Sequence, residues 1–209
     1  QSLGSGGGVK CYHSEHIYGE MWHKAFICCG DVPLCKYELV FGRSTNASQP
    51  PATICREVEA RVSGRKSIQI EPHLSQTGAK ADEWIPIKPK TDAAFLLAML
   101  HTMLHEIKQW DLPFLKTMTN SPYLVGLQGY YVRDSGSKKP LLWDLEDGKA
   151  KPFDAADIKN AALEGSYMIS GVQAKPVFQL LLEHLKQYSP EWAAGICDVP
   201  AEKIRNIAR

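Results

Sequence analysis

The sequence predicts an α/β fold: a Rossmann-like parallel sheet flanked by helices, with a hairpin-bearing insertion. Two observations predict it. Two β-rich runs, Tyr37–Phe41 and Ser67–Ile70, are separated by a polar loop and a helical stretch. That connection is long enough for a parallel, right-handed crossover. Later, the segment from Asn120 to Lys175 is rich in Gly, Asp, Lys and Tyr and carries short strand-like runs, which is typical of hairpins.

Size and composition limit the class of protein. The chain has 209 residues, of which 44% are hydrophobic and 22% charged, as in ordinary globular proteins with a buried core. Its net charge of +1 does not indicate a nucleic-acid partner. The longest apolar run, Ala93–Leu100, is too short to span a bilayer. We therefore expect a single dinucleotide-type domain over residues 1–209, including an insertion at about 120–175, with no membrane span.

The first part of the chain alternates strand and helix signals. Gly42 ends the first strand, Ser63-Gly64 ends the following helix, and the proline of the third strand favours a strand end. The expected elements are a strand at 37–41, a polar turn-forming loop at 43–51, a helix at about 52–62, a strand at 67–70, a loop or short helix at 75–81 and a strand at 84–87.

The rest of the chain is mainly helical outside the insertion. Thr91 is a suitable N-cap, with Asp92 in the first turn of a helix that runs to about Lys108. This helix is apolar on nearly every side at its start, so we expect it to be buried. The other expected elements are a short helix at 113–118, strand-like runs at 130–132 and 141–143, an amphipathic helix from Pro176, a helix capped by Ser189 and a last helix opened by residues 199–202.

Three polar loops follow the three expected strands, at residues 42–48, 71–75 and 88–92. In parallel sheets, ligands bind at the carboxyl ends of the strands. The three loops therefore predict a nucleotide-binding cleft.

Residues 68–99 carry the strongest motif signal. They contain Glu71-Pro72-His73, then TGAKAD at 77–82, WIPI at 84–87 and PKTD at 89–92. This order resembles the dimethyl sulfoxide reductase and formate dehydrogenase family of molybdenum or tungsten enzymes, in which DPR, T-A-x-x-A-D, a W-I-P-I-like strand and PGTD follow one another. Residues 37–48, 114–125 and 175–209 extend the resemblance over most of the chain.

The resemblance implies that this domain binds one of the two molybdopterin guanine dinucleotides that hold the metal. Asp92 matches the family position whose carboxylate accepts hydrogen bonds from the guanine edge, a pairing that suits two parallel N–H donors. The implied cofactor-binding residues are Gly42, Ser44, Asn46, Glu71, His73, Thr77, Pro89, Thr91 and Asp92.

The chain departs from the family pattern at several of these positions. Glu71 replaces Asp, His73 replaces Arg, Ser44 replaces Asn, and Lys90 replaces the Gly of PGTD, so we expect a slightly different loop backbone there. Structural alternatives stay open. Asp92 is also explained as a helix-terminal charge and Glu71 as a surface carboxylate. The hydroxyls of Ser75 and Thr77 are equally typical of helix caps.

The resemblance also implies a metal ligand. Cys11 lies about thirty residues before Gly42, near the spacing of the family's cysteine or selenocysteine ligand. A thiolate is a soft ligand, and the neighbouring Lys10 favours it. His13 and His16 are candidate catalytic proton carriers, since histidine titrates near neutrality. The alternatives are a buried or loop cysteine and ordinary surface histidines. No CxxC pair occurs, so the sequence predicts neither a zinc ribbon nor a complete iron–sulfur motif, and six cysteines in 209 residues do not suggest a disulfide framework.

By resemblance, the chain is a fragment of the catalytic subunit of a molybdopterin-dependent oxidoreductase of prokaryotic anaerobic metabolism, cytoplasmic or periplasmic. Its expected partners are the remaining domains of that subunit, a small-molecule substrate and an iron–sulfur electron-transfer subunit. A [4Fe–4S] cluster is expected elsewhere in the full-length chain, and the isolated fragment should be inactive. Two alternatives remain: a non-catalytic nucleotide-binding or electron-transfer accessory module, and an unrelated α/β domain for NAD or a sugar nucleotide. No GxGxxG turn follows a strand, which disfavours NAD.

Overall fold

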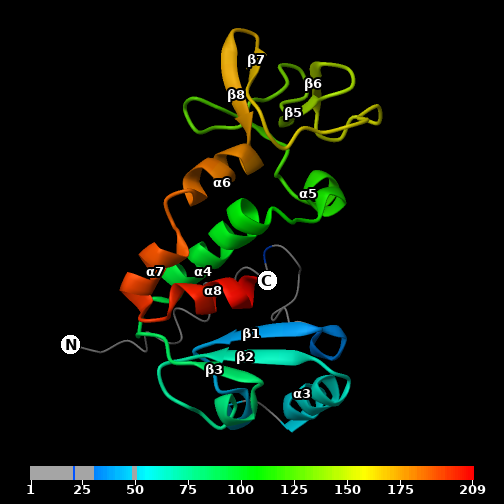
Figure 1. Ribbon diagram of the computed structural model, residues 1–209. Helices are drawn as coiled ribbons and strands as arrows, with labels where there is room; N and C mark the ends of the chain where they lie inside the picture. Colours follow the sequence, from blue (N-terminus) through cyan, green and yellow to red (C-terminus); the bar gives the residue numbers. More distant parts are fainter. Residues whose placement is uncertain (1–20, 22–30, 49–50) are drawn as a thin grey trace, which may run out of the picture. The chain divides into compact units, whose positions relative to one another are not determined.

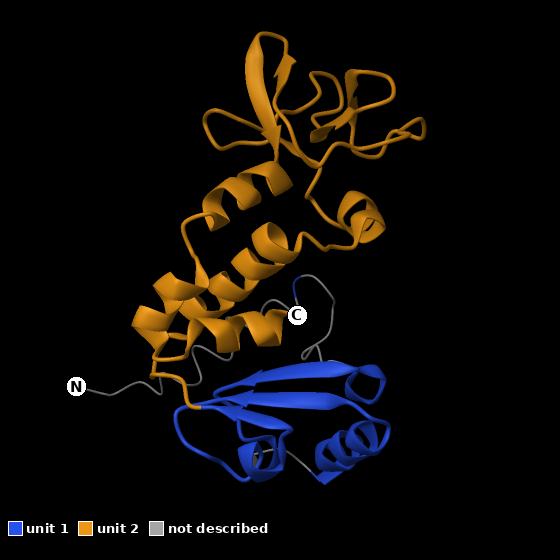
Figure 2. Cartoon of the chain, viewed as in Figure 1, with its two compact units in different colours: residues 1–85 blue, residues 86–209 orange. Residues whose placement is uncertain are grey.

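The computed structural model describes residue 21 and residues 31–48 and 51–209 (Figure 1). The chain divides into two compact units, residues 1–85 and 86–209 (Figure 2). We call them the first and the second unit and describe each by itself. The single domain over residues 1–209 stays a prediction.

The first unit contains a parallel sheet, as the sequence predicts. Its strands β1 (Tyr37–Phe41), β2 (Lys66–Ile70) and β3 (Glu83–Ile85) lie in the order β1-β2-β3. Helix α3 (Pro51–Val62) connects β1 to β2, and the two strands pair in parallel with Leu39 opposite Ile68. The short elements are η3 (Val32–Leu34), α2 (Thr45–Ser48) and η4 (Gly78–Lys80). The α/β class is therefore confirmed.

The third strand is shorter than the predicted 84–87. It ends at Ile85 because the next residue is Pro86, which has no N–H for the ladder. In the central strand β2, residues 67–70 are all buried. Strands that are buried on both sides are typical of parallel sheets.

The second unit begins with the long helix that the sequence predicts, but the last part of this helix is π-helical. Helix α4 (Asp92–His101) continues as a π-helical segment, η5 (Thr102–Ile107), and ends at Lys108 with φ 57°. The ring nitrogens of His101 and His105 donate to main-chain carbonyls of Leu185 and Leu182, at 2.8 and 2.9 Å. Both histidines thereby fasten this segment to the later helix that carries these leucines.

The remaining helices are α5 (Leu112–Met118), α6 (Val177–Leu185), α7 (Pro190–Cys197) and α8 (Ala201–Ala208). The predicted cap at Ser189 is confirmed, because its hydroxyl accepts from the Trp192 N–H at 3.2 Å. The predicted position of Thr91 as the N-cap residue is confirmed. Thr91 occupies the N-cap of α4, but its hydroxyl donates backward to the Lys88 carbonyl at 2.6 Å. None of the described helices has the length and apolar character needed to cross a membrane.

The predicted insertion contains two antiparallel sheets, which confirms its hairpins. Strands β4 (Leu124–Gly126), β7 (Tyr167–Ile169) and β8 (Val172–Pro176) form one sheet in the order β4-β8-β7. Strands β5 (Leu141–Asp144) and β6 (Lys149–Pro152) form the other. Their shared core is built on Leu124, Leu141 and Ala174.

A buried charge cluster closes the β5–β6 hairpin. The Lys151 ammonium lies 2.9 Å from Oδ2 of Asp144 and 3.0 Å from Oδ2 of Asp157, and it also bonds Asp147. Asp144 is fully buried and accepts further hydrogen bonds from the main-chain N–H groups of Lys159 and Asn160. The cluster thereby ties the hairpin to the chain segment that follows it.

Candidate functional site

The loop after β1 leaves the sheet at Gly42. This glycine has φ +56°, a conformation that strains residues with a side chain, and its N–H donates to the Ile70 carbonyl at 3.0 Å. One residue further, the Arg43 carbonyl accepts from Nε2 of Gln69 at 2.7 Å. Both bonds hold the loop against the carboxyl end of β2.

Three of the predicted cofactor residues come together on Thr77. Its hydroxyl oxygen accepts from the Asn46 N–H at 3.0 Å and lies 3.2 Å from the Ser44 hydroxyl. Thr77 makes no capping bond to η4, whereas the Ser75 hydroxyl accepts from the Gly78 N–H at 3.1 Å. Of the two hydroxyls, Ser75 therefore acts as a helix cap, and Thr77 joins the loops that follow β1 and β2.

Glu71 is buried, with 4% of its surface exposed, so its interpretation as a surface carboxylate is wrong. Its Oε1 accepts from the Ser75 N–H at 3.0 Å. A Cβ at Gly78 would lie 3.0 Å from the same oxygen, so a larger residue there would require the carboxylate to shift. Glu71 thus shapes its own loop. The neighbouring His73 is exposed and has no hydrogen-bond or ion-pair partner among the described residues.

Gln69 is a candidate that the sequence did not identify. It is 1% exposed, and its Oε1 has no hydrogen-bond partner in the described part of the chain. In the pattern Ser67-Ile68-Gln69-Ile70, alternation suggests a side chain that faces water. The buried amide instead positions Arg43 and leaves one acceptor unused.

The remaining predicted residues belong to the second unit. Pro89 is exposed, and Thr91 and Asp92 are half-buried. Lys90 has φ +68°, the left-handed conformation that glycine favours, which explains why a glycine suits this position in the PGTD pattern. Within the described residues the Asp92 carboxylate has no hydrogen-bond or ion-pair partner, and it lies at the start of α4, where a negative charge is stabilised.

The predicted metal ligand Cys11 and the proton carriers His13 and His16 lie outside the described residues. Within the described ranges, no three His, Cys, Asp or Glu side chains form a group that could hold a metal ion. The described cysteines Cys35, Cys55 and Cys197 are free thiols. Burial raises the pKa of the Cys197 thiol, so that it stays protonated at neutral pH.

We expect Thr77→Val to lower the free energy of unfolding by about 1 kcal/mol, because the half-buried loop junction loses the acceptor for the Asn46 N–H. Urea unfolding followed by far-UV circular dichroism measures this. Thr117→Val is the matched control, since the Thr117 hydroxyl is exposed and bonds only within its own helix. Equal midpoints for both variants would show that the junction contributes nothing to stability.

No family model matches the chain. Curated proteins do match it. A sulfite dehydrogenase subunit of Allochromatium vinosum is 37% identical over 161 residues, covering 69% of this chain and 16% of the relative. The dimethyl sulfoxide reductase of Haemophilus influenzae is 33% identical over 202 residues, covering 93% of this chain and 20% of the relative. The thiosulfate reductase molybdopterin-containing subunit of Salmonella typhimurium is 25% identical over 179 residues, covering 86% of this chain and 16% of the relative. The chain thus spans 16% to 20% of the length of these three relatives.

Proposed function

The chain belongs to the molybdopterin oxidoreductases of the dimethyl sulfoxide reductase type, and from that relationship we propose that it supplies a guanine-nucleotide site to the catalytic subunit of such an enzyme. The observation that carries the proposal is the Asp92 carboxylate, which is half-buried, stands at a helix start and has no partner among the described residues. The proposed whole enzyme is a molybdenum or tungsten oxidoreductase that acts on a small molecule.

Asp92 suits the guanine edge chemically. Guanine presents two adjacent donors, N1–H and N2–H, and a carboxylate accepts both in parallel. Asp92 lies in the first turn of α4, at the positive end of the helix dipole, where an anionic acceptor is stabilised. The residues of the second unit therefore fit the guanine end of a dinucleotide.

The candidate residues of the first unit act in a different way from the one that the motif suggests. The Glu71 carboxylate accepts from the Ser75 N–H. The Thr77 hydroxyl is hydrogen-bonded to the Ser44 hydroxyl and the Asn46 N–H. We assign these residues to loop shape rather than to direct contact. Among the described residues, the exposed His73 and the orphan Oε1 of Gln69 are two groups near the end of β2 that keep unused hydrogen-bonding capacity.

The proposal extends to residues outside the described ranges. Cys11 is the proposed thiolate ligand of the metal, and His13 and His16 are the proposed proton carriers. When bound, the pterin would supply dithiolene sulfurs to a metal that exchanges two electrons with the substrate. The proposed partners are an iron–sulfur electron-transfer subunit and the other domains of the catalytic subunit, which would hold a [4Fe–4S] cluster.

We expect Asp92→Asn to weaken binding of GDP to the chain by roughly 10- to 100-fold. The variant loses a charged acceptor, and hydrogen bonds to charged groups contribute about 1.5–3 kcal/mol each. Isothermal titration calorimetry with GDP, and with ADP for comparison, measures the change. Adenine lacks the two parallel donors, so ADP should bind more weakly than GDP to the unmodified chain. The affinity for ADP should be the same in the unmodified chain and in Asp92→Asn.

Asp198→Asn is the matched control. Asp198 is exposed at the end of α7 with φ 59°, a conformation that asparagine also tolerates. If GDP bound no more tightly than ADP to the unmodified chain, or if both variants bound GDP equally, the guanine role of Asp92 would be lost.

A further inference from the structure

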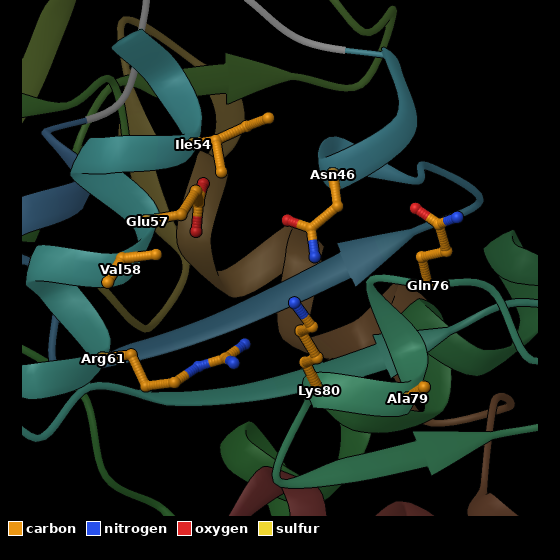
Figure 3. Close-up of a pocket in the computed structure, with 8 residues that line it drawn as sticks. All are labelled: Asn46, Ile54, Glu57, Val58, Arg61, Gln76, Ala79 and Lys80. Atoms are coloured by element: carbon orange, nitrogen blue, oxygen red, sulfur yellow. The ribbon is translucent and has the colours of Figure 1, made fainter. Parts of the chain in front are cut away.

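A pocket of about 470 Å³ lies in the first unit between α3 and η4 (Figure 3). One wall is formed by Ile54, Val58 and Arg61 of α3. Gln76 and Lys80 lie across from it, before and within η4. The volume falls in the range of about 300–1,000 Å³ that small-molecule sites occupy.

Two cations from different elements face this pocket. Figure 3 shows the Arg61 guanidinium and the Lys80 ammonium pointing into the space between the two walls. Neither side chain has a hydrogen bond or ion pair with any residue that the structure describes. Two like charges that share a pocket repel each other, and an anion placed between them removes that repulsion.

The acidic residue in the lining does not neutralise this pair. Oε2 of Glu57 lies 2.6 Å from Nη1 of Arg65, which is buried and also pairs with Glu38 at 2.9 Å. The Glu57 charge is therefore paired with Arg65, which does not line the pocket. Arg61 and Lys80 remain as the charges available to a ligand.

The other lining groups suit a phosphate group that carries a small apolar substituent. The side-chain amides of Asn46 and Gln76 supply neutral donors, and Ile54 and Val58 supply an apolar surface. The guanidinium fork matches two phosphate oxygens at once, whereas the ammonium acts as a compact point charge.

We propose that this pocket binds a phosphate group, either as the free anion or as a small phosphate monoester, with Arg61 and Lys80 as its charged ligands. The site goes beyond the proposed guanine-nucleotide site. Glu71, His73 and Asp92 do not line the pocket, and Asn46 is the one residue that both sites include.

Calorimetric titration of the 209-residue chain with potassium phosphate and with phenyl phosphate, at an ionic strength held constant with KCl, tests this. Arg61→Gln and Lys80→Gln should each weaken binding about tenfold, since each removes one charge-assisted contact. Lys80→Arg should retain binding. Arg56→Gln is the matched control, because Arg56 lies on the same helix but pairs with Asp31 at 3.3 Å and does not line the pocket.

Tighter binding of phenyl phosphate than of phosphate would identify the monoester as the ligand, and equal binding would identify the free anion. The proposal fails if neither compound binds to the unmodified chain. It also fails if Arg61→Gln and Lys80→Gln bind phosphate and phenyl phosphate as tightly as Arg56→Gln does. All variants should unfold at the same urea concentration, which shows that they are folded alike. Asp92→Asn should leave phosphate binding unchanged. Loss of the guanine preference alone would therefore contradict the proposed function but not this site.

Discussion

Replacing Lys151 with methionine should unfold the hairpin segment of the second unit at a temperature about 10 °C lower. The Lys151 ammonium is 4% exposed and is the cation that Asp144, Asp147 and Asp157 share. Without it, the fully buried Asp144 carboxylate remains without its counter-ion, and uncompensated buried charges are among the most destabilising changes. Near-UV circular dichroism reports this segment, because Trp143 stacks on Tyr167 with ring centroids 4.7 Å apart.

Lys139→Met is the control for the loss of a lysine in the same segment. Lys139 pairs with Asp154 at the surface, where both side chains are nearly half exposed, so its melting temperature should change by no more than about 2 °C. Equal melting of the two variants would show that the buried cluster is not needed for the fold.

The same cluster has a pH signature. The hydrogen bond from Lys151, assisted by the Lys159 N–H, holds the pKa of the Asp144 carboxyl well below its usual range. Burial alone would lower the pKa of Lys151, but its bonds to Asp147, Asp144 and Asp157 raise it above the ordinary value. Because the folded-state pKa of Asp144 is depressed, its stabilisation is present above about pH 4, the unfolded value, and is lost as the pH falls further. The Lys151→Met variant should lose the share of this acid-sensitive stability that the Lys151 bond supplies, and keep the share that comes from the main-chain N–H groups of Lys159 and Asn160.

Neither this cluster nor the phosphate pocket is visible in the sequence, for the same physical reason. Asp144, Asp147, Lys151 and Asp157 have the spacing of an ordinary solvated turn, and Arg61 is an ordinary helix-surface charge. The burial of Asp144 and Lys151, and the convergence of Arg61 with Lys80, depend on how segments that are separate in the sequence fold against one another. Local patterning carries no information about that step.

The elements themselves were far more predictable. The β-rich runs at 37–41 and 67–70 and the helix between them follow from hydrophobic pattern and turn residues, and β1 and β2 pair as expected. Two features of these elements could not be predicted from the sequence. The sequence pattern of a helix does not distinguish α from π winding, so the sequence does not predict η5. The polar Gln69, which is buried within β2, contradicts simple alternation.

At the candidate site, motif order placed Ser44, Asn46 and Thr77 in one group, and the structure shows them in contact across 31 and 33 residues of chain. Motif order could not assign their roles. Whether a hydroxyl faces a ligand or a neighbouring loop depends on angles and distances of a few ångströms, which only the folded chain fixes. The same holds for Glu71, whose carboxylate turns onto its own loop.

Cys11→Ala, in the longer subunit proposed to contain this chain, should lower turnover by about 100-fold or more. A soft thiolate is a strong ligand for a metal already bound by sulfur, and Lys10 favours the ionised thiol. Loss even of residues that only support a ligand costs about 10- to 100-fold in activity, so loss of the ligand itself should cost at least as much. Turnover and metal content, measured on the same preparation, test this.

Cys55→Ala is the control, because Cys55 is an exposed free thiol on α3 and no role is proposed for it. Its turnover should match that of the unmodified subunit. The guanine nucleotide content of the Cys11→Ala protein should be preserved, since the proposed guanine contact is Asp92. Unchanged turnover in Cys11→Ala would exclude this thiol from the metal site. Loss of the guanine nucleotide together with activity would instead show that Cys11 acts on the fold.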